Sequence, residues 1–335
     1  MDDLLKFTDR GIYVSKADVY VDPWRPVNKA LITHAHADHS RWGMKHYLAH
    51  HHSIPIMKHR LGRDIKVQEI AYGEPLKING VSFSFHPAGH IPGSAQIAVS
   101  HKDQKWVVSG DYKLESDGLS IPFETVDCSH FISECTFGLP VYKWPDSKEV
   151  LASMKNWIVQ NRREGVVSVI LAYALGKSQR IIHGLANEAG TAFTHGAVEV
   201  NNELLEEIGY HIPSHQKITA DSKRDEVLNG FVIAPSSVIG TPWLRKLKPY
   251  RLAMASGWMQ LRGAKRRRNV DKGFVLSDHA DWIGLNAAIE ATGAEHIYVT
   301  HGYTDIFSTW LKGKGYKAHI VQTDFTDNED EEVTS

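Results

Sequence analysis

The stretch THAHADHS, residues 33–40, decides how this chain is interpreted. It follows directly on KALIT (29–33), whose apolar and β-branched residues predict a strand. The motif therefore lies on a loop at the carboxyl end of a strand, where α/β sheets place their ligand sites. Its spacing is His-x-His-x-Asp-His, with side chains at His34, His36, Asp38 and His39.

Alternate residues of an extended segment point the same way, so His34 and His36 can hold one metal ion while Asp38 and His39 face a second. Nitrogen and oxygen donors packed this tightly repel one another unless a cation lies between them. A surface histidine cluster is the alternative, but the strand before the motif favours a two-metal site.

Two further motifs supply the missing ligands. HPAGHIPGSAQ (86–96) places His90 in a turn rich in glycine and proline, where the backbone can approach an ion closely. VVSGDYK (107–113) ends an apolar strand with Asp111, and a carboxylate there can bridge two ions ~3.5–4 Å apart. An aspartate that only forms a turn is the alternative. In this order, the motifs predict His90 as the third histidine of site one and Asp111 as the bridge.

Composition restricts the class of protein but does not name a substrate. Hydrophobic residues make up 42% of the 335 and charged residues 23%, as in ordinary globular enzymes. The net charge is −1, so any nucleic-acid surface must be local. Two cysteines are too few for a disulfide framework, and the opening MDDLLKFTDRG lacks the layout of a signal peptide. No apolar run reaches the length of a membrane span, so we expect a cytoplasmic protein without a membrane partner.

The pattern of elements changes twice along the chain. Short strands dominate the first part, at 11–15, 18–22, 29–33, 81–85 and 105–110. Ser147 is expected to cap a helix, and strand–helix pairs follow, with strands at 166–172 and 231–235 and a helix at 177–189. Strands that lead into motifs return at 251–255, 273–277, 296–300 and 318–322, with helices at 281–291 and 304–314. We therefore expect a metal-site domain of residues 1–140 and 251–335 and an inserted α/β domain of 141–250.

The order of these motifs resembles the metallo-β-lactamase superfamily, and three later motifs resemble its β-CASP nucleases. They are ISECTFG (132–138) with Glu134, LSDHADW (276–282) with His279, and YVTHGY (298–303) with His301. The resemblance implies an α/β fold, namely an αββα sandwich with an inserted β-CASP domain. It also implies that Asp38, His39 and His301 hold the second metal.

The same resemblance implies two catalytic roles. His279 would contact the scissile phosphate or protonate the leaving oxygen, and Glu134 would hydrogen-bond His279 and keep it protonated. Asp38 would also orient the nucleophile. The alternatives are a helix-capping pair in SDHADW, with Asp278 or Asp281 as the acting residue, and a surface carboxylate at Glu134.

Over nearly its whole length the chain resembles the bacterial DNA-ligase-associated exonucleases. The resemblance implies a DNA exonuclease that acts in repair beside an ATP-dependent ligase. His301 is the one departure, because a histidine at the last motif is more typical of RNA-processing members. The resemblance rests on eight stretches: TDRGIYV, DPWRPV, THAHADHSRWG, FHPAGHIPGSAQ, SGDYK, TFGLPVY, YALGKSQR and SGWMQLRG. Single-stranded DNA is the expected substrate, and an RNA-processing ribonuclease is the alternative. The expected cofactors are two divalent metal ions, zinc first, with manganese or iron as alternatives.

Two basic segments are candidates for substrate binding. LRGAKRRR (261–268) offers Arg262, Lys265 and Arg266 to phosphates, and GKSQR (176–180) offers Lys177 at a helix start. A solvated charge run is the alternative for the first segment. HHH (50–52) lacks a carboxylate and metal-ligand spacing, so we interpret it as a solvated or packing cluster.

Two other functions fit fewer motifs. A small-molecule hydrolase of the same fold, such as a thioesterase or lactonase, leaves the insertion, Glu134 and His279 without a role. A nucleic-acid-binding subunit with a dead site would lack metal ligands, whereas every expected ligand is present here.

Overall fold

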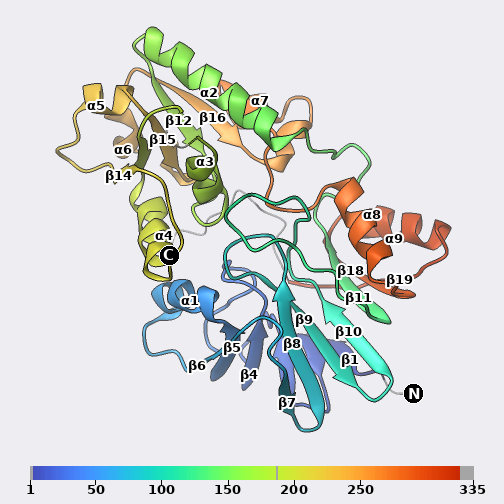
Figure 1. The fold of residues 1–335 in the computed structure, drawn as a ribbon. Coiled ribbons are helices and arrows are strands. Elements are labelled where there is room, and N and C mark those ends of the chain that lie inside the picture. The colour runs from blue at the N-terminus through green and yellow to red at the C-terminus, as the bar shows by residue number, and fades with distance from the viewer. Residues whose placement is uncertain (1–2, 186–187, 325–335) are drawn as a thin grey trace. The chain divides into compact units, whose positions relative to one another are not determined.

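The computed structural model describes residues 3–185 and 188–324. These residues form two compact units (Figure 1). Of the described residues, the first unit contains 3–140 and 279–324, and the second unit contains Val141–Asp278.

The first sheet of the first unit holds six strands in chain order. Its first three strands pair antiparallel and the rest pair parallel, so β3, β4, β5 and β6 all end at the same edge. The strands are β1 (Leu5–Thr8), β2 (Gly11–Val14), β3 (Val19–Val21), β4 (Lys29–Ile32), β5 (His46–His50) and β6 (Val67–Ile70).

The second sheet holds seven strands in the order β19-β18-β11-β10-β9-β8-β7. The strands from β7 to β10 form an antiparallel meander, and β10, β11, β18 and β19 pair parallel. The strands are β7 (Leu76–Ile78), β8 (Val81–Pro87), β9 (Ala95–His101), β10 (Gln104–Val108), β11 (His130–Cys135), β18 (His296–Gly302) and β19 (Lys317–Ile320).

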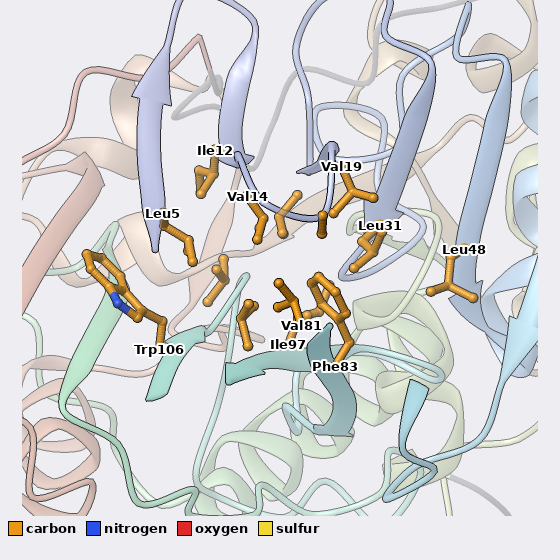
Figure 2. Packing of buried hydrophobic residues seen from close by; sticks show 14 of the residues in the cluster. Leu5, Ile12, Val14, Val19, Leu31, Leu48, Val81, Phe83, Ile97 and Trp106 are labelled. Atoms are coloured by element: carbon orange, nitrogen blue, oxygen red, sulfur yellow. The ribbon is translucent and has the colours of Figure 1, made fainter. Parts of the chain in front are cut away.

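An apolar layer between the two sheets holds the first unit together (Figure 2). Val14 and Leu31 enter it from the first sheet, and Phe83 and Trp106 enter it from the second. Strand β8 shows how the sequence specifies this layer, because buried and half-buried residues alternate along it as the pattern VSFSF predicts.

Helices cover the outer side of the second sheet. Helix α8 (Trp282–Ala291) and α9 (Thr304–Gly313) place Leu285, Ile289 and Phe307 in a second apolar cluster with the sheet residues Phe131 and Ile297. Helix α1 (Ile54–Leu61) follows β5 and buries Ile56 and Met57. The α/β class and the helix-covered sandwich expected for this unit are confirmed.

The second unit is built around a parallel sheet in the order β14-β13-β15-β12-β16-β17. Its strands are β12 (Val167–Leu171), β13 (Ala192–Thr194), β14 (His215–Lys217), β15 (Phe231–Ala234), β16 (Tyr250–Ala255) and β17 (Lys272–Phe274). Its helices are α2 (Ser147–Arg163), α3 (Lys177–Leu185), α4 (Gly196–Glu207), α5 (Arg224–Leu228), α6 (Pro242–Arg245) and α7 (Ala264–Arg267).

Two local expectations differ from the structure. The second unit extends to Asp278 instead of ending at residue 250, because β16 pairs with β12 and β17 pairs with β16. Helix α2 is capped by Asp146, whose side chain accepts from the Lys148 amide, and Ser147 is its first residue.

No helix within the described ranges is both long and apolar enough to span a bilayer.

The core between the two sheets should dominate the stability of the first unit. Phe83 is 1% exposed, so Phe83→Ala leaves a cavity and should lower the free energy of unfolding by ~3–5 kcal/mol. Trp42 is 76% exposed, and Trp42→Ala should change it by less than ~0.5 kcal/mol. Urea denaturation followed by circular dichroism measures both, and equal effects would contradict this assignment of the core.

Candidate active site

The predicted metal ligands lie on loops and strand ends at one edge of the sandwich. His34 follows β4, His90 lies between β8 and β9, Asp111 follows β10, and His301 lies near the end of β18. In sequence they span most of the chain, yet the structure brings them together. One group contains His34, His36, His90 and Asp111, and a second contains His39, Asp111 and His301.

The carboxylate of Asp111 belongs to both groups and faces each with a different oxygen. Its Oδ2 lies 3.4 Å from Nε2 of His34 and 3.8 Å from Nε2 of His90. Its Oδ1 lies 3.5 Å from Nε2 of His39 and 3.2 Å from Nε2 of His301. This geometry suits a carboxylate that bridges two cations.

The surroundings of His34 test whether a cation fits. Thr33 Oγ1 donates to Asp22 at 2.5 Å, so its lone pair accepts from the Nδ1 proton of His34 at 3.0 Å. Nε2 of His34 then carries a lone pair, is fully buried, and has no hydrogen-bond partner in the described part of the chain. Burial lowers the pKa of His34 well below its ordinary value, so the ring stays neutral. A lone pair facing a carboxylate in the interior is repulsive, and a metal ion between them removes the repulsion.

The second group also attracts positive charge. Burial opposes protonation of His39, but the Asp111 and Asp38 carboxylates outweigh it and raise its pKa well above the ordinary value. The pKa of His301 is raised against burial in the same way by Asp111. Burial alone would raise the pKa of Asp111, but the nearby His39 and His279 rings outweigh it and hold the pKa well below the usual range. A divalent cation supplies the charge that these carboxylates favour.

Asp38 lies beside the second group. Its Oδ2 is 3.5 Å from Nε2 of His39, and its side chain is 20% exposed, whereas those of Asp111 and His39 are almost fully buried. Asp38 is therefore half-buried and more accessible to solvent than Asp111 or His39, and its place at this site is a proposal.

Asp22 is a buried residue at the candidate site that the sequence interpretation missed. It follows β3, the parallel neighbour of β4, and is 1% exposed. Its Oδ2 accepts from Nδ1 of His39 at 2.8 Å and from Thr33 Oγ1, so it orients His39 directly and His34 through Thr33. The available signal was DVYVDPW (18–24), an aspartate and a proline at the end of a strand next to the metal motif.

Two glycines let the backbone carry ligands into this crowded space. Gly89 precedes His90 and Gly110 precedes Asp111, and both have positive φ, +73° and +57°. A Cβ on Gly89 would lie 2.2 Å from the Lys113 carbonyl oxygen, and a Cβ on Gly110 would lie 2.7 Å from the Thr33 side chain. Only glycine fits at these positions.

His279 and Glu134 form a buried pair next to the metal groups. Nδ1 of His279 lies 2.8 Å from Oε2 and 3.0 Å from Oε1 of Glu134. The carboxylate also accepts from the Tyr112 amide and from Thr136 Oγ1, which fixes it in the interior. The His279 ring centroid lies 4.7 Å from that of His90. Glu134 is thus 1% exposed and is not a surface carboxylate.

The helix-capping residue of SDHADW (277–282) is not part of the His279–Glu134 pair. Asp281 caps α8 by accepting from the Gly284 amide, and Asp278 lies 3.5 Å from Arg180. Capping therefore does not use His279, whose ring is directed to Glu134.

The predicted substrate-binding residues lie in the second unit and differ in exposure. Lys177 is 2% exposed at the start of α3. Arg262 and Arg266 are exposed, in and beside the four-residue helix α7. The side chain of Lys265 lies outside the described part of the structure. Contact of these residues with a substrate remains a proposal.

Removal of Asp22 should weaken metal binding at both groups. Asp22→Ala frees the rings of His39 and His34 to rotate, so metal affinity should fall ~10–100-fold. Asp9→Ala, which removes an exposed partner of Arg25, should leave the affinity unchanged. Isothermal titration of the metal-free protein with zinc measures both, and wild-type affinity in Asp22→Ala would refute the orienting role.

A side chain at Gly110 should disturb the ligands, whereas one at Gly73 should only strain the backbone. Both glycines have positive φ, but no atom lies within 4 Å of a Cβ at Gly73. Gly73→Ala should lower the free energy of unfolding by ~1–2 kcal/mol and retain metal affinity. Gly110→Ala displaces Thr33 and should lower zinc affinity at least ~10-fold by titration. Equal zinc affinities in the two variants would contradict this account.

Comparison with known proteins finds similar sequences. No family model matches the chain. A "Probable DNA ligase" of Opitutus terrae is 27% identical over 96% of this chain but only 31% of its own length. A "Probable RNase MJ4" of Methanocaldococcus jannaschii is 28% identical, covering 47% of this chain and 45% of its own. "Ribonuclease TTHA0252" of Thermus thermophilus is 25% identical, covering 52% and 44%.

The chain therefore spans less than half the length of each of these relatives. Among solved structures, a protein of unknown function from Enterococcus faecalis V583 aligns with 81% of this chain and 74% of its own, with a TM-score of 0.56. Its sequence identity is 11%, so it supports the fold alone. The order of motifs along the chain, their convergence on Asp111 and the inserted parallel α/β unit agree with the metallo-β-lactamase/β-CASP nucleases, to which the chain is similar.

Proposed function

We propose that this protein is a metal-dependent phosphodiesterase that degrades DNA from an end. The observation that carries the proposal is the position of Asp111, whose two oxygens face two separate histidine groups. Two divalent ions held there, when bound, lower the pKa of water toward neutrality and offset charge on a phosphate. His34, His36 and His90 would hold one ion, His39, Asp38 and His301 the other, and Asp111 both.

Zinc is the expected metal. Five of the proposed ligands are imidazoles, and imidazole suits zinc, although manganese and iron accept the same nitrogen and oxygen donors. The two carboxylates complete a mixed donor set.

His279 is proposed to protonate the leaving oxygen. Glu134 holds its Nδ1, Nε2 is the atom proposed to deliver the proton, and the negative charge of Glu134 favours the protonated ring. Asp38, the most accessible carboxylate at the site, is proposed to orient the attacking water. This pair and the inserted unit favour a nuclease over a small-molecule hydrolase, which needs neither.

DNA is preferred over RNA because of one relative. In the "Probable DNA ligase", the part similar to this chain is under a third of the protein, so a homologous unit shares a polypeptide with ligase activity. Removal of damaged ends prepares DNA for joining, which supports a repair role beside an ATP-dependent ligase, in the cytoplasm with the chromosome. Ribonuclease activity is the second candidate, because two other relatives are named ribonucleases.

Lys177, Arg262, Lys265 and Arg266 are proposed to bind phosphates. The exposed Arg262 and Arg266 offer guanidinium groups to a polyanion. Because the net charge of the whole chain is −1, positive charge for binding a polyanion must come from local groups such as these.

Labelled substrates test the proposal. Single-stranded DNA and matched RNA, labelled at the 5′ or the 3′ end, are incubated with zinc or manganese. The wild type should give metal-dependent DNA products that shorten from one end. His279→Ala should slow cleavage ~10²–10⁴-fold, as loss of a general acid does, and Asp111→Ala should abolish it.

Matched surface variants control for nonspecific effects. His59→Ala and Asp103→Ala change exposed residues and should retain wild-type rates. Cleavage of RNA alone would assign the protein to RNA processing. Failure to cleave either polymer with any metal, together with hydrolysis of a simple ester, would refute a nuclease.

A further inference from the structure

A second set of histidines lies in the first unit, outside the catalytic groups. His50 ends β5, and His51 and His52 begin the short 3₁₀ helix η1 (His51–Ser53). Each offers a ring nitrogen, and the three nitrogens lie within 4.8 Å of one another. The sequence predicted only a packing or solvated cluster, because HHH lacks a carboxylate and metal-ligand spacing. The turn from β5 into η1 brings the three histidines together.

The spacing of these rings matches that of the catalytic histidines. The centroids of His50, His51 and His52 are separated by 4.2, 4.3 and 4.9 Å. Those of His34, His36 and His90 are separated by 4.8 and 4.9 Å. Two histidine triads of one size therefore occur in the same unit.

The lone pair of the buried member is directed toward the cluster. Nδ1 of His50 accepts a long hydrogen bond, 3.3 Å, from the His52 amide, so this nitrogen is unprotonated and faces η1. The ring of His50 stacks on Tyr72 at 3.7 Å, which fixes its plane. A metal ion at this nitrogen has to displace the weak hydrogen bond, which turns the His52 amide away from the ring.

The charge of the cluster suits a metal. Burial, then the nearby His51 and His52 rings, lowers the pKa of His50 to about 3, and burial and His51 lower the pKa of His52. Rings that are neutral near pH 7 have the lone pairs that a metal requires.

The backbone under the cluster is held in place. Ser53 Oγ donates to the Gly93 carbonyl oxygen at 3.0 Å, and a Cβ on Gly93 would lie 2.8 Å from the Ser53 amide nitrogen. Tyr72 donates to the Ser94 carbonyl oxygen at 2.7 Å. The short helix and the ring under it are therefore anchored to one loop, while His51 and His52 both reach solvent.

We propose that His50, His51 and His52 form a third metal site, separate from the catalytic pair, that takes one divalent transition-metal ion. Three imidazoles without a carboxylate select zinc, nickel or copper over magnesium, calcium or manganese. Solvent completes the coordination, because His51 and His52 lie at the surface. The site does not depend on the proposed nuclease activity.

Metal counting on the full chain tests the site. The protein is freed of metal, titrated with zinc by calorimetry, and measured for bound zinc by mass spectrometry. The wild type should bind three equivalents. The double variant His51→Gln/His52→Gln should bind two, with the affinity of the third equivalent reduced at least ~10-fold. His59→Gln changes an exposed histidine of the next helix, α1, and should retain three.

Two further measurements separate the alternatives. In an Asp111→Ala background, one equivalent lost on His51→Gln/His52→Gln supports the site even if the catalytic ions no longer bind. Zinc anomalous scattering should place an ion ~2.0–2.1 Å from a His50 nitrogen. Three equivalents in the double variant, or equal loss in His59→Gln, would overturn the proposal. Unchanged thermal melting of the metal-free double variant shows that it is folded.

Discussion

The repulsion between buried lone pairs around Asp111 is the constraint on which the rest of this molecule depends. A carboxylate and imidazole nitrogens 3.2–3.8 Å apart, removed from water, are unstable unless a cation or a proton lies between them. Asp22 accounts for how the rings are kept in that arrangement, because it accepts hydrogen bonds from Nδ1 of His39 and from Thr33 Oγ1 on the side away from the site. Gly89 and Gly110 account for how the backbone comes close enough. The site is thus a set of mutually dependent contacts in which no ligand is positioned independently.

The sandwich supplies the rigidity that this arrangement needs. Parallel strands β3 and β4 end side by side, which places Asp22 next to Thr33, and β10, β11 and β18 bring Asp111, Glu134 and His301 to their common edge. The apolar layer between the sheets fixes the strands, and the strands fix the ligands (Figure 2). Tyr112 joins the candidate metal groups to the His279–Glu134 pair, since its amide donates to Glu134 and its carbonyl oxygen accepts from the Ala280 amide.

Local patterns predicted most of the first unit. The alternation in VSFSF and the spacing in THAHADHS depend on neighbours in sequence, so one sequence suffices to interpret them. The pairing of Glu134 with His279 was accessible only through a family resemblance, because 145 residues separate the two.

Asp22 was missed because its role depends on which strand pairs with β4. The end of the insertion was misplaced for the same reason: β16 has the composition of a motif-bearing strand, but its partner is β12. Asp146 displaced Ser147 as a cap because both residues are good caps and only geometry separates them.

The interruption of the first unit has a consequence for biosynthesis. The ribosome synthesises every strand of the second unit's parallel sheet, which lies within Val141–Asp278, before it reaches His279 and His301. The first sheet and the meander of the second sheet are already made by then, but strands β18 and β19 and helices α8 and α9, which complete that sheet and its cover, are still missing. Domains commonly fold as units during translation. The nascent chain therefore carries a partial site through most of its elongation, and the capacity for chemistry arises only when β18 inserts beside β11.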